Sequence, residues 1–199
     1  MIILGIDPGT ATIGYGVLGF SLQKKKVKMN SSSSFCAPAA KIECLAYGLI
    51  ETTPKDSFPN RLKKISKDYN GLINKYRPDL IAIESVFFFR NLKTFIPVSR
   101  ATGVLILGAA KKNIPIVEFT PPQVKLRVAG YGRAEKKDLQ KKVEKILNLE
   151  KIPKPDDIAD ALGVALCAAF SLVNDNKAGK ARDDQKNGFF SSQCSGARE

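Results

Sequence analysis

Four acidic residues stand where carboxylates could do chemistry together. Asp7 and Glu84 each follow a short apolar run, while Asp157 and Asp160 are three residues apart at the start of a helical pattern. Strands of open α/β folds present their chemistry at the carboxyl edge of the sheet, and residues three apart share a helix face. If that helix crosses the sheet, the four carboxylates can converge, and a bound divalent cation would remove their mutual repulsion.

The chemistry that such a cluster predicts is metal-dependent cleavage of a phosphodiester. Carboxylate oxygens are hard ligands that suit Mg²⁺. Two such ions, ~3.5–4 Å apart, could activate water and stabilise the leaving oxygen. We therefore expect Asp7, Glu84, Asp157 and Asp160 to be both catalytic residues and metal ligands.

Each acid also has a simpler structural explanation. Asp7 precedes Pro8-Gly9 and suits a turn, and Asp157 suits the N-terminus of a helix, where acids are favoured. Glu84 and Asp160 are harder to explain in this way, because both have apolar neighbours and an unpaired buried acid is costly. Asp156 remains an alternative to Asp157 as the metal ligand.

Composition narrows the chemistry further. The 199 residues include 32 Lys and Arg against 19 Asp and Glu, a net charge of +13, and no histidine. The lack of histidine excludes Ser-His-Asp and Cys-His catalysis. The basic surplus indicates a polyanionic partner, which is nucleic acid or an anionic membrane surface, unless it merely reflects a lysine-rich proteome. We favour nucleic acid.

The chain also has features that bear on its location. No apolar run reaches the ~18 residues of a membrane span, and the N-terminus has no basic segment typical of a signal peptide. We expect a cytoplasmic protein without a membrane partner. Its four cysteines form no C-x-x-C pair, so we expect reduced thiols and no zinc site of the usual kind: Cys36, Cys44, Cys167 and Cys194.

The elements that must position the acids follow from hydrophobic periodicity. We expect strands at residues 2–6, 13–18, 42–50, 80–83 and 114–119, and helices at 61–76, 98–112, after Thr120, at 135–147 and from about 156 to 172. This order predicts an α/β fold: a mixed five-stranded sheet with an antiparallel hairpin and flanking helices. Neither a Walker A loop nor a dinucleotide-binding glycine motif occurs.

The domain organisation that we expect is simple. Residues 1–172 form one domain, and residues about 20–40, rich in lysine and serine, form a flexible basic insertion that adds contacts to a nucleic-acid backbone. Residues 173–199 are polar and aperiodic, so we expect a disordered tail.

Several motifs together resemble the RuvC family of bacterial Holliday-junction resolvases, which are crossover junction endodeoxyribonucleases. The resemblance covers roughly residues 1–170 apart from the insertion. The motifs occur in order as GIDPGT at 5–10, GYGV at 14–17, AIESVF at 82–87, QVK at 123–125, AEK at 134–136 and DIADAL at 157–162. None of these motifs would suffice alone, since DPGT also resembles the phosphate loop of actin-like ATPases.

The resemblance implies an RNase H-like fold and a homodimer that binds a four-way DNA junction. It implies paired nicks in two opposing strands with Mg²⁺, two ions per active site and Mn²⁺ as a substitute, and a branch-migration motor complex as a partner. The same four acids match the family's catalytic residues. The positions implied to contact DNA are Phe87, Arg90, Lys125 and Lys136. The two lysines also fit a solvated helix face, and Phe87 also fits core packing.

The sequence departs from the family pattern in two places. One is the insertion, and the other is Arg100-Ala101-Thr102-Gly103, where the family usually has Gln-Ala-Arg-Gly. Some relatives also have histidine where this chain has Asp160. Three other functions remain open: an RNase H-like nuclease for other substrates, a non-catalytic DNA-binding relative, and an actin-like ATPase, although the last needs about twice this length.

Overall fold

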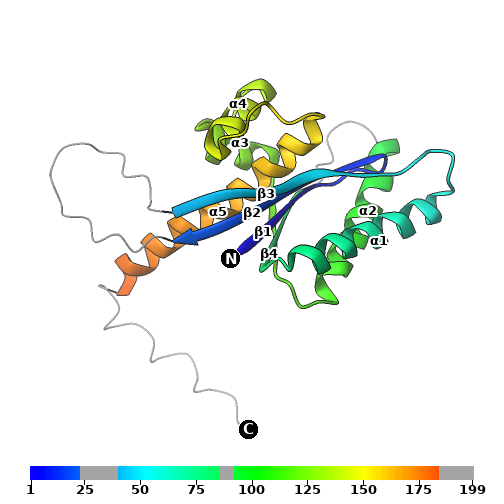
Figure 1. Cartoon of the computed structure of the whole chain (residues 1–199), viewed down its shortest axis with the longest axis horizontal. Helices are drawn as coiled ribbons and strands as arrows, with labels where there is room; N and C mark the ends of the chain where they lie inside the picture. The colour runs from blue at the N-terminus through cyan, green and yellow to red at the C-terminus, as the bar shows by residue number, and fades with distance from the viewer. Residues whose placement is uncertain (23–39, 86–91, 184–199) are drawn as a thin grey trace, which may run out of the picture.

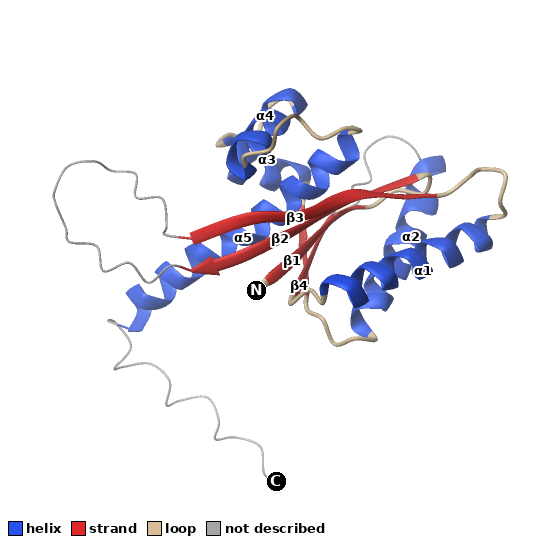
Figure 2. Cartoon of the chain, viewed as in Figure 1, coloured by secondary structure: helices blue, strands red, loops and turns tan. Residues whose placement is uncertain are grey.

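The five strands form one mixed sheet in the computed structural model, which describes residues 1–22, 40–85 and 92–183 (Figure 2). The strand order is β3-β2-β1-β4-β5. The central β1 pairs antiparallel with β2 and parallel with β4, and β5 continues the parallel half. The strands are β1 (Ile2–Asp7), β2 (Thr12–Leu22), β3 (Ala40–Glu51), β4 (Leu80–Glu84) and β5 (Ile116–Phe119). The predicted α/β fold with its N-terminal hairpin is confirmed.

Helices cover both faces of this sheet (Figure 1). On one face α5 (Asp156–Asp183) packs on β1 and β2, with α3 (Pro121–Ala129) and α4 (Lys136–Leu147) beside its first turns. The other face carries the paired helices α1 (Phe58–Tyr76) and α2 (Leu92–Ala110). The sheet therefore separates two hydrophobic cores.

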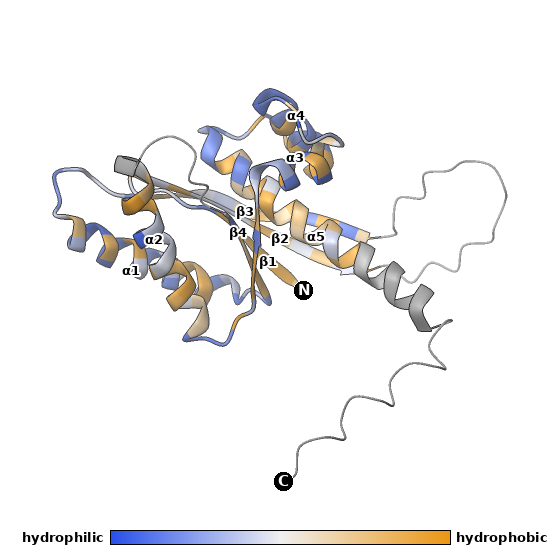
Figure 3. Cartoon of the chain, turned by 180° about the vertical axis from the view of Figure 1, so that it is seen from behind, coloured by the Kyte–Doolittle hydropathy of each residue, from blue (hydrophilic) through white to orange (hydrophobic). Residues whose placement is uncertain are grey.

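Successive residues of β1 face opposite sides of the sheet, so this strand contributes side chains to both hydrophobic cores. Ile3 faces the α5 core, whereas Leu4 and Ile6 face the α1–α2 core, and all three are fully buried. Strands buried on both faces read as continuous apolar runs, which is the pattern of residues 2–6. Seen from behind, the part of α5 that crosses the sheet is coloured mostly as apolar (Figure 3). This seating places the start of α5 at the end of β1.

Local capping fixes where α3 and α4 begin. Thr120 caps α3 through a box in which its side chain accepts from the backbone of Gln123 while the Gln123 side chain accepts from the backbone N–H of Thr120. Glu135 and Asp138 form the corresponding box at α4. Such boxes satisfy backbone N–H groups that would otherwise lack partners. The two helices that flank the acids therefore start at defined residues, as predicted for Thr120.

Two element boundaries differ from the predicted ones. The insertion was expected from about residue 20, whereas β2 continues to Leu22 and β3 begins at Ala40, because Phe20 extends the buried alternation and pairs with Ile42. The tail was expected from residue 173, but α5 continues to Asp183. The residues of this extension include Lys, Ala and Arg, which are good helix formers. Residues 23–39 and 184–199 lie outside the described residues.

Two further expectations concern the cysteines and the membrane. Cys44 and Cys167 are free thiols, while Cys36 and Cys194 lie outside the described residues. Within the described ranges, no helix combines the length and the apolar character needed to cross a bilayer.

Candidate active site

Two of the four acids lie side by side at the carboxyl edge of the sheet. Asp7 is the last residue of β1 and Glu84 the last residue of β4. The two strands are parallel, and Ile6 is the register partner of Ile83, one residue before each acid. Burial of these strands leaves the acids as the first groups that emerge from the sheet. The prediction that strand ends bring Asp7 and Glu84 together therefore holds in the structure.

The other two acids come from the first turns of α5, which lies close against the hairpin. A Cβ atom added to Gly14 would lie 1.9 Å from the carbonyl oxygen of Asp157, and one added to Gly5 would lie 2.2 Å from that of Ala161. Gly14 is also the register partner of Asp7. Glycine therefore permits a helix-to-strand approach that no other residue would allow. This close approach sets Asp157 and Asp160 beside Asp7.

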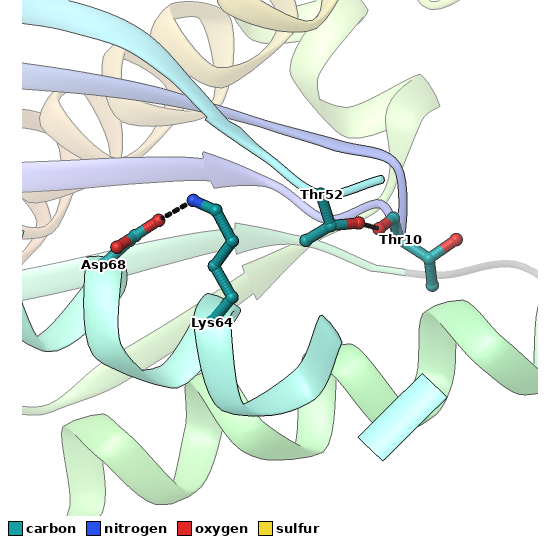
Figure 4. Close-up of polar contacts among 4 residues, drawn as sticks. All are labelled: Thr10, Thr52, Lys64 and Asp68. Carbon is teal, nitrogen blue, oxygen red and sulfur yellow. Dashed lines mark hydrogen bonds and ion pairs between the residues drawn. The ribbon is translucent and has the colours of Figure 1, made fainter. Parts of the chain in front are cut away.

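The turn that follows Asp7 is tied to the neighbouring elements. The backbone carbonyl of Thr10 accepts a hydrogen bond from the Thr52 hydroxyl at 2.5 Å (Figure 4). It also accepts one from the Arg61 guanidinium at 2.6 Å, and Arg61 donates to the Thr52 hydroxyl as well. Arg61 belongs to α1, so the turn is anchored to the helical layer as well as to the end of β3. These hydrogen bonds to the Thr10 carbonyl anchor the turn that follows Asp7 at the sheet edge.

Electrostatics within the cluster are strongly unfavourable to four ionised acids. Burial and the charges of Glu84, Asp160 and Asp157 raise the pKa of Asp7 to about 9. Burial and the charge of Asp160 raise the pKa of Glu84 to about 7, although its hydrogen bond with Asp7 acts in the opposite direction. Burial also raises the pKa of Asp160. Without a cation, the cluster retains protons that free carboxyl groups would have lost.

Two lysines share the site with the acids. Glu84, Asp160, Lys125 and Lys136 line one hollow of about 150 Å³ between the sheet edge, α3, α4 and α5. Lys136 forms an ion pair with Asp160 at 2.9 Å, and the charges of both lysines lower the pKa of Glu84. The site therefore combines oxygen ligands with cationic groups that suit a phosphate.

Asp156 and Asp157 are neighbours in sequence but have different surroundings. Asp156 is exposed, accepts a hydrogen bond from Gln140 at 2.9 Å and forms an ion pair with Lys136 at 3.4 Å. Asp157 is half-buried, and its charge acts on Asp7. These surroundings favour Asp157 as the acid that faces the sheet edge. Sequence reasoning missed Gln140, a buried polar residue whose partner only the tertiary structure reveals.

The donor chemistry of the cluster fits a hard divalent cation. The chain has no histidine, and within the described ranges no thiolate accompanies the four carboxylates, a donor set that suits Mg²⁺ rather than zinc. Among the residues that the structure describes, however, no three acids or cysteines are arranged so that they could hold one ion as they stand. Asp7 and Glu84 hydrogen-bond to each other, and Lys136 holds Asp160. The side chains must therefore rearrange for an ion to be held.

We expect the metal-free protein to lose stability as the pH rises. Asp7 has a pKa of about 9 in the fold against an ordinary value of 3.8. Its contribution to the free energy of unfolding is therefore fully present below about pH 4 and is lost progressively as the pH rises to about 9. The slope for one group is at most about 1.4 kcal/mol per pH unit. The melting temperature in a chelator should fall between pH 5 and pH 8, and Mg²⁺ should restore it. A melting temperature equal at both pH values, or unaffected by Mg²⁺ at pH 8, would contradict this.

Two predicted DNA contacts cannot be placed. Phe87 and Arg90 belong to residues 86–91, which lie outside the described residues. In the sequence this segment directly follows Glu84 and Ser85.

Comparisons of the sequence and of the structure with known proteins identify the same family. Residues 3–168 match the sequence model of the family described as "Crossover junction endodeoxyribonuclease RuvC". A protein of that name from Alkaliphilus oremlandii is 46% identical over 171 residues, which cover 86% of this chain and 94% of the relative.

Solved structures show the same likeness. The Thermus thermophilus RuvC structure superposes with a TM-score of 0.73 at 30% identity, covering 86% of this chain and 95% of that chain. The T. thermophilus RuvC structure in complex with a Holliday junction substrate superposes with a TM-score of 0.72 at 27% identity and the same coverage.

Proposed function

Because the chain belongs to the RuvC family of crossover junction endodeoxyribonucleases, we propose that it cuts four-way DNA junctions by paired hydrolysis of phosphodiesters in two opposing strands. The observation that carries the proposal is the acid cluster at the carboxyl edge of an RNase H-like sheet. The cluster joins two strand ends to the start of α5, within a chain of net charge +13. The related structure with a Holliday junction supports the choice of substrate.

We assign the chemistry to Asp7, Glu84, Asp157 and Asp160, which would hold Mg²⁺. When bound, the metal supplies a nucleophilic water and charge stabilisation at the scissile phosphate. Asp7 and Glu84 position the ligand oxygens from rigid strand ends, and α5 brings Asp157 and Asp160 to the same edge. Two ions per site, with Mn²⁺ as a substitute, fit this number of carboxylates.

Lys125 and Lys136 would hold the DNA backbone beside the acids. Lys125 is half-buried and lies in the same hollow as Glu84, where an ammonium group can pair with a phosphate oxygen. Phe87 and Arg90 complete the proposed DNA contacts by family resemblance. In the sequence both follow Glu84 closely.

We further propose that the protein is a homodimer formed through α2, since cutting two strands needs two sites. The exposed face of α2 carries Ile96, Arg100, Gly103, Leu107 and Ala110, which alternate at spacings of four and three residues. This is the spacing of a helix that pairs with another helix. Ile96 and Leu107 are 46% and 54% exposed, which is unusual for large apolar side chains on one stripe. Arg100, which stands where the family usually has glutamine, lies on this stripe.

We also propose a cellular location and a partner for the protein. A DNA-processing enzyme of this family would act in the cytoplasm, and the resemblance extends the proposal to a branch-migration motor complex as a partner. A different RNase H-like nuclease is the main alternative, because acids alone do not choose between substrates. A non-catalytic relative is disfavoured, because all four acids are present. Substrate competition separates these functions.

The proposed function predicts Mg²⁺-dependent cutting of a synthetic four-way junction. With Mg²⁺ we expect symmetric nicks in two opposing strands, and with a chelator binding without cutting. An RNA–DNA hybrid and a linear duplex of the same sequence serve as competitors, and gel electrophoresis of end-labelled strands reports the cuts. Preferential cutting of the hybrid would identify another nuclease, and junction binding without any cutting in Mg²⁺ or Mn²⁺ would identify a non-catalytic protein.

A further inference from the structure

Lys136 occupies a position that its own helix does not favour. It is the first residue of α4, where the positive end of the helix dipole opposes a cation. Its ammonium group nevertheless lies 2.9 Å from Oδ2 of Asp160 and 3.4 Å from Oδ2 of Asp156. Burial alone would lower the pKa of Lys136, yet its hydrogen bond to Asp160 and the charges of the two acids raise it. The acids of α5 therefore determine where this ammonium group lies.

Asp156 is built to hold Lys136 rather than to face the sheet edge. The buried Gln140 side chain donates from Nε2 to Oδ1 of Asp156 at 2.9 Å, which leaves Oδ2 for Lys136. Gln140 is one helical turn after Lys136 on α4, so the two side chains lie on the same face. Asp156 thus links α5 to α4 and provides a second anchor for the ammonium group.

The two ion pairs of Lys136 differ in their exposure and in whether they occupy the proposed metal site. Asp156 is exposed, with 56% of its side chain accessible, and it lies at the rim. The Asp160 side chain is only 18% accessible and lines the hollow that contains Glu84 and Lys125. An ammonium group on Oδ2 of Asp160 therefore takes an oxygen that the proposed metal site needs.

We propose that Lys136 is a displaceable counter-ion, which competes with a divalent cation for Asp160 in the DNA-free protein and moves to a backbone phosphate when DNA binds. The proposal rests on the proposed function, since it concerns the same acids. Its consequence is that DNA and metal each strengthen the binding of the other, because both displace the same contact. Free enzyme would then hold metal weakly and become loaded on its substrate.

The first test measures metal affinity without DNA. Lys136→Met should bind Mg²⁺ or Mn²⁺ roughly two- to fivefold more tightly than the wild type by calorimetry, the range expected for loss of a partly exposed ion-pair competitor. Lys137→Met, on the next exposed residue of α4, controls for a lost surface charge. Lys125→Met controls for a lost charge within the hollow, since Lys125 lines it but forms no ion pair with Asp160 among the described residues. Equal tightening in Lys125→Met and Lys136→Met, or no tightening in Lys136→Met, would overturn the proposal.

The second test follows Lys136 directly in the full-length wild-type protein. An amine-acylating reagent with mass-spectrometric mapping should modify Lys136 faster once Mg²⁺ is added, while the rate at Lys137 stays constant. An unchanged rate at Lys136 under saturating Mg²⁺ would overturn the proposal. The proposed function fails separately, since a wild type that binds Mg²⁺ but cuts no junction would refute the nuclease alone, and one that binds no Mg²⁺ would refute both.

Discussion

Replacing Asp7 by asparagine should abolish junction cleavage while leaving junction binding intact. Asp7 lies between Glu84 and the start of α5, and the charges of Glu84, Asp160 and Asp157 all act on it. An amide at this position keeps the shape but provides a weaker ligand oxygen. We expect the cleavage rate to fall by at least roughly 10²- to 10³-fold, the scale seen when one group that stabilises transition-state charge is lost. Binding should stay the same or become tighter, because one negative charge near the DNA phosphates is removed.

The melting temperature of the same variant distinguishes a loss of catalysis from a loss of folding. Burial makes ionised Asp7 costly, so Asp7→Asn should raise the melting temperature of the metal-free protein at pH 8 and reduce its dependence on pH. Gel-shift measurement of junction affinity, thermal melting and single-turnover cleavage together test the prediction. A variant that unfolds or no longer binds the junction would mark Asp7 as a structural residue.

Asp68→Asn is the matched control for Asp7→Asn. Asp68 lies on α1, on the opposite side of the sheet from α5, and forms an ion pair with Lys64 one turn earlier (Figure 4). The substitution makes the same chemical change at a surface pair, which is worth only about 0.3–0.5 kcal/mol. Cleavage and junction binding should match the wild type. A comparable loss of cleavage in this control would mean that charge in general, rather than the acid cluster, governs activity.

The sheet and its acids could be predicted because their signals are local. Glu84 follows four buried residues, so an apolar run with an acid at its end already locates a strand end. Asp156 and Asp157 could not be separated in this way. Adjacent helical residues point about 100° apart, and which one faces the sheet depends on how α5 is seated. That seating is a tertiary property, set by contacts between residues far apart in the chain.

The ion pairs of Lys136 also depend on tertiary structure, so they could not be predicted from the sequence. Its motif placed it near DNA, but its ion pairs with Asp156 and Asp160 join two helices. Small residues in two distant segments indicate where α5 lies on the sheet. Ala161 and Ala165 on α5 lie where Gly5 approaches the helix, so small residues in both elements marked the contact. A glycine in a strand, matched by small residues on a later helix, is the signal that could have placed α5.

Replacing Gly14 by alanine should therefore damage both the fold and the site. The added Cβ would lie 1.9 Å from the carbonyl oxygen of Asp157 and 2.4 Å from its carbonyl carbon, which are backbone atoms that cannot rotate away. The start of α5 must move, and overpacking of this kind typically costs about 1–3 kcal/mol. Because Gly14 pairs with Asp7 in the sheet, the same displacement separates Asp157 from Asp7. A shift of about 1 Å in reacting groups can cost ~10²-fold in rate.

Gly19→Ala in the same strand distinguishes this effect from a general intolerance of alanine. The nearest atoms to a Cβ at Gly19 belong to the Leu45 side chain at 3.6 Å, an ordinary contact. Gly19→Ala should leave cleavage unchanged and the melting temperature equal or slightly higher, because alanine loses less backbone entropy than glycine on folding. Gly14→Ala should melt at a lower temperature and cut the junction at least ~10²-fold more slowly under conditions where it is still folded. A folded Gly14→Ala that cuts at the wild-type rate would show that the seating of α5 on β2 does not position Asp157 for catalysis.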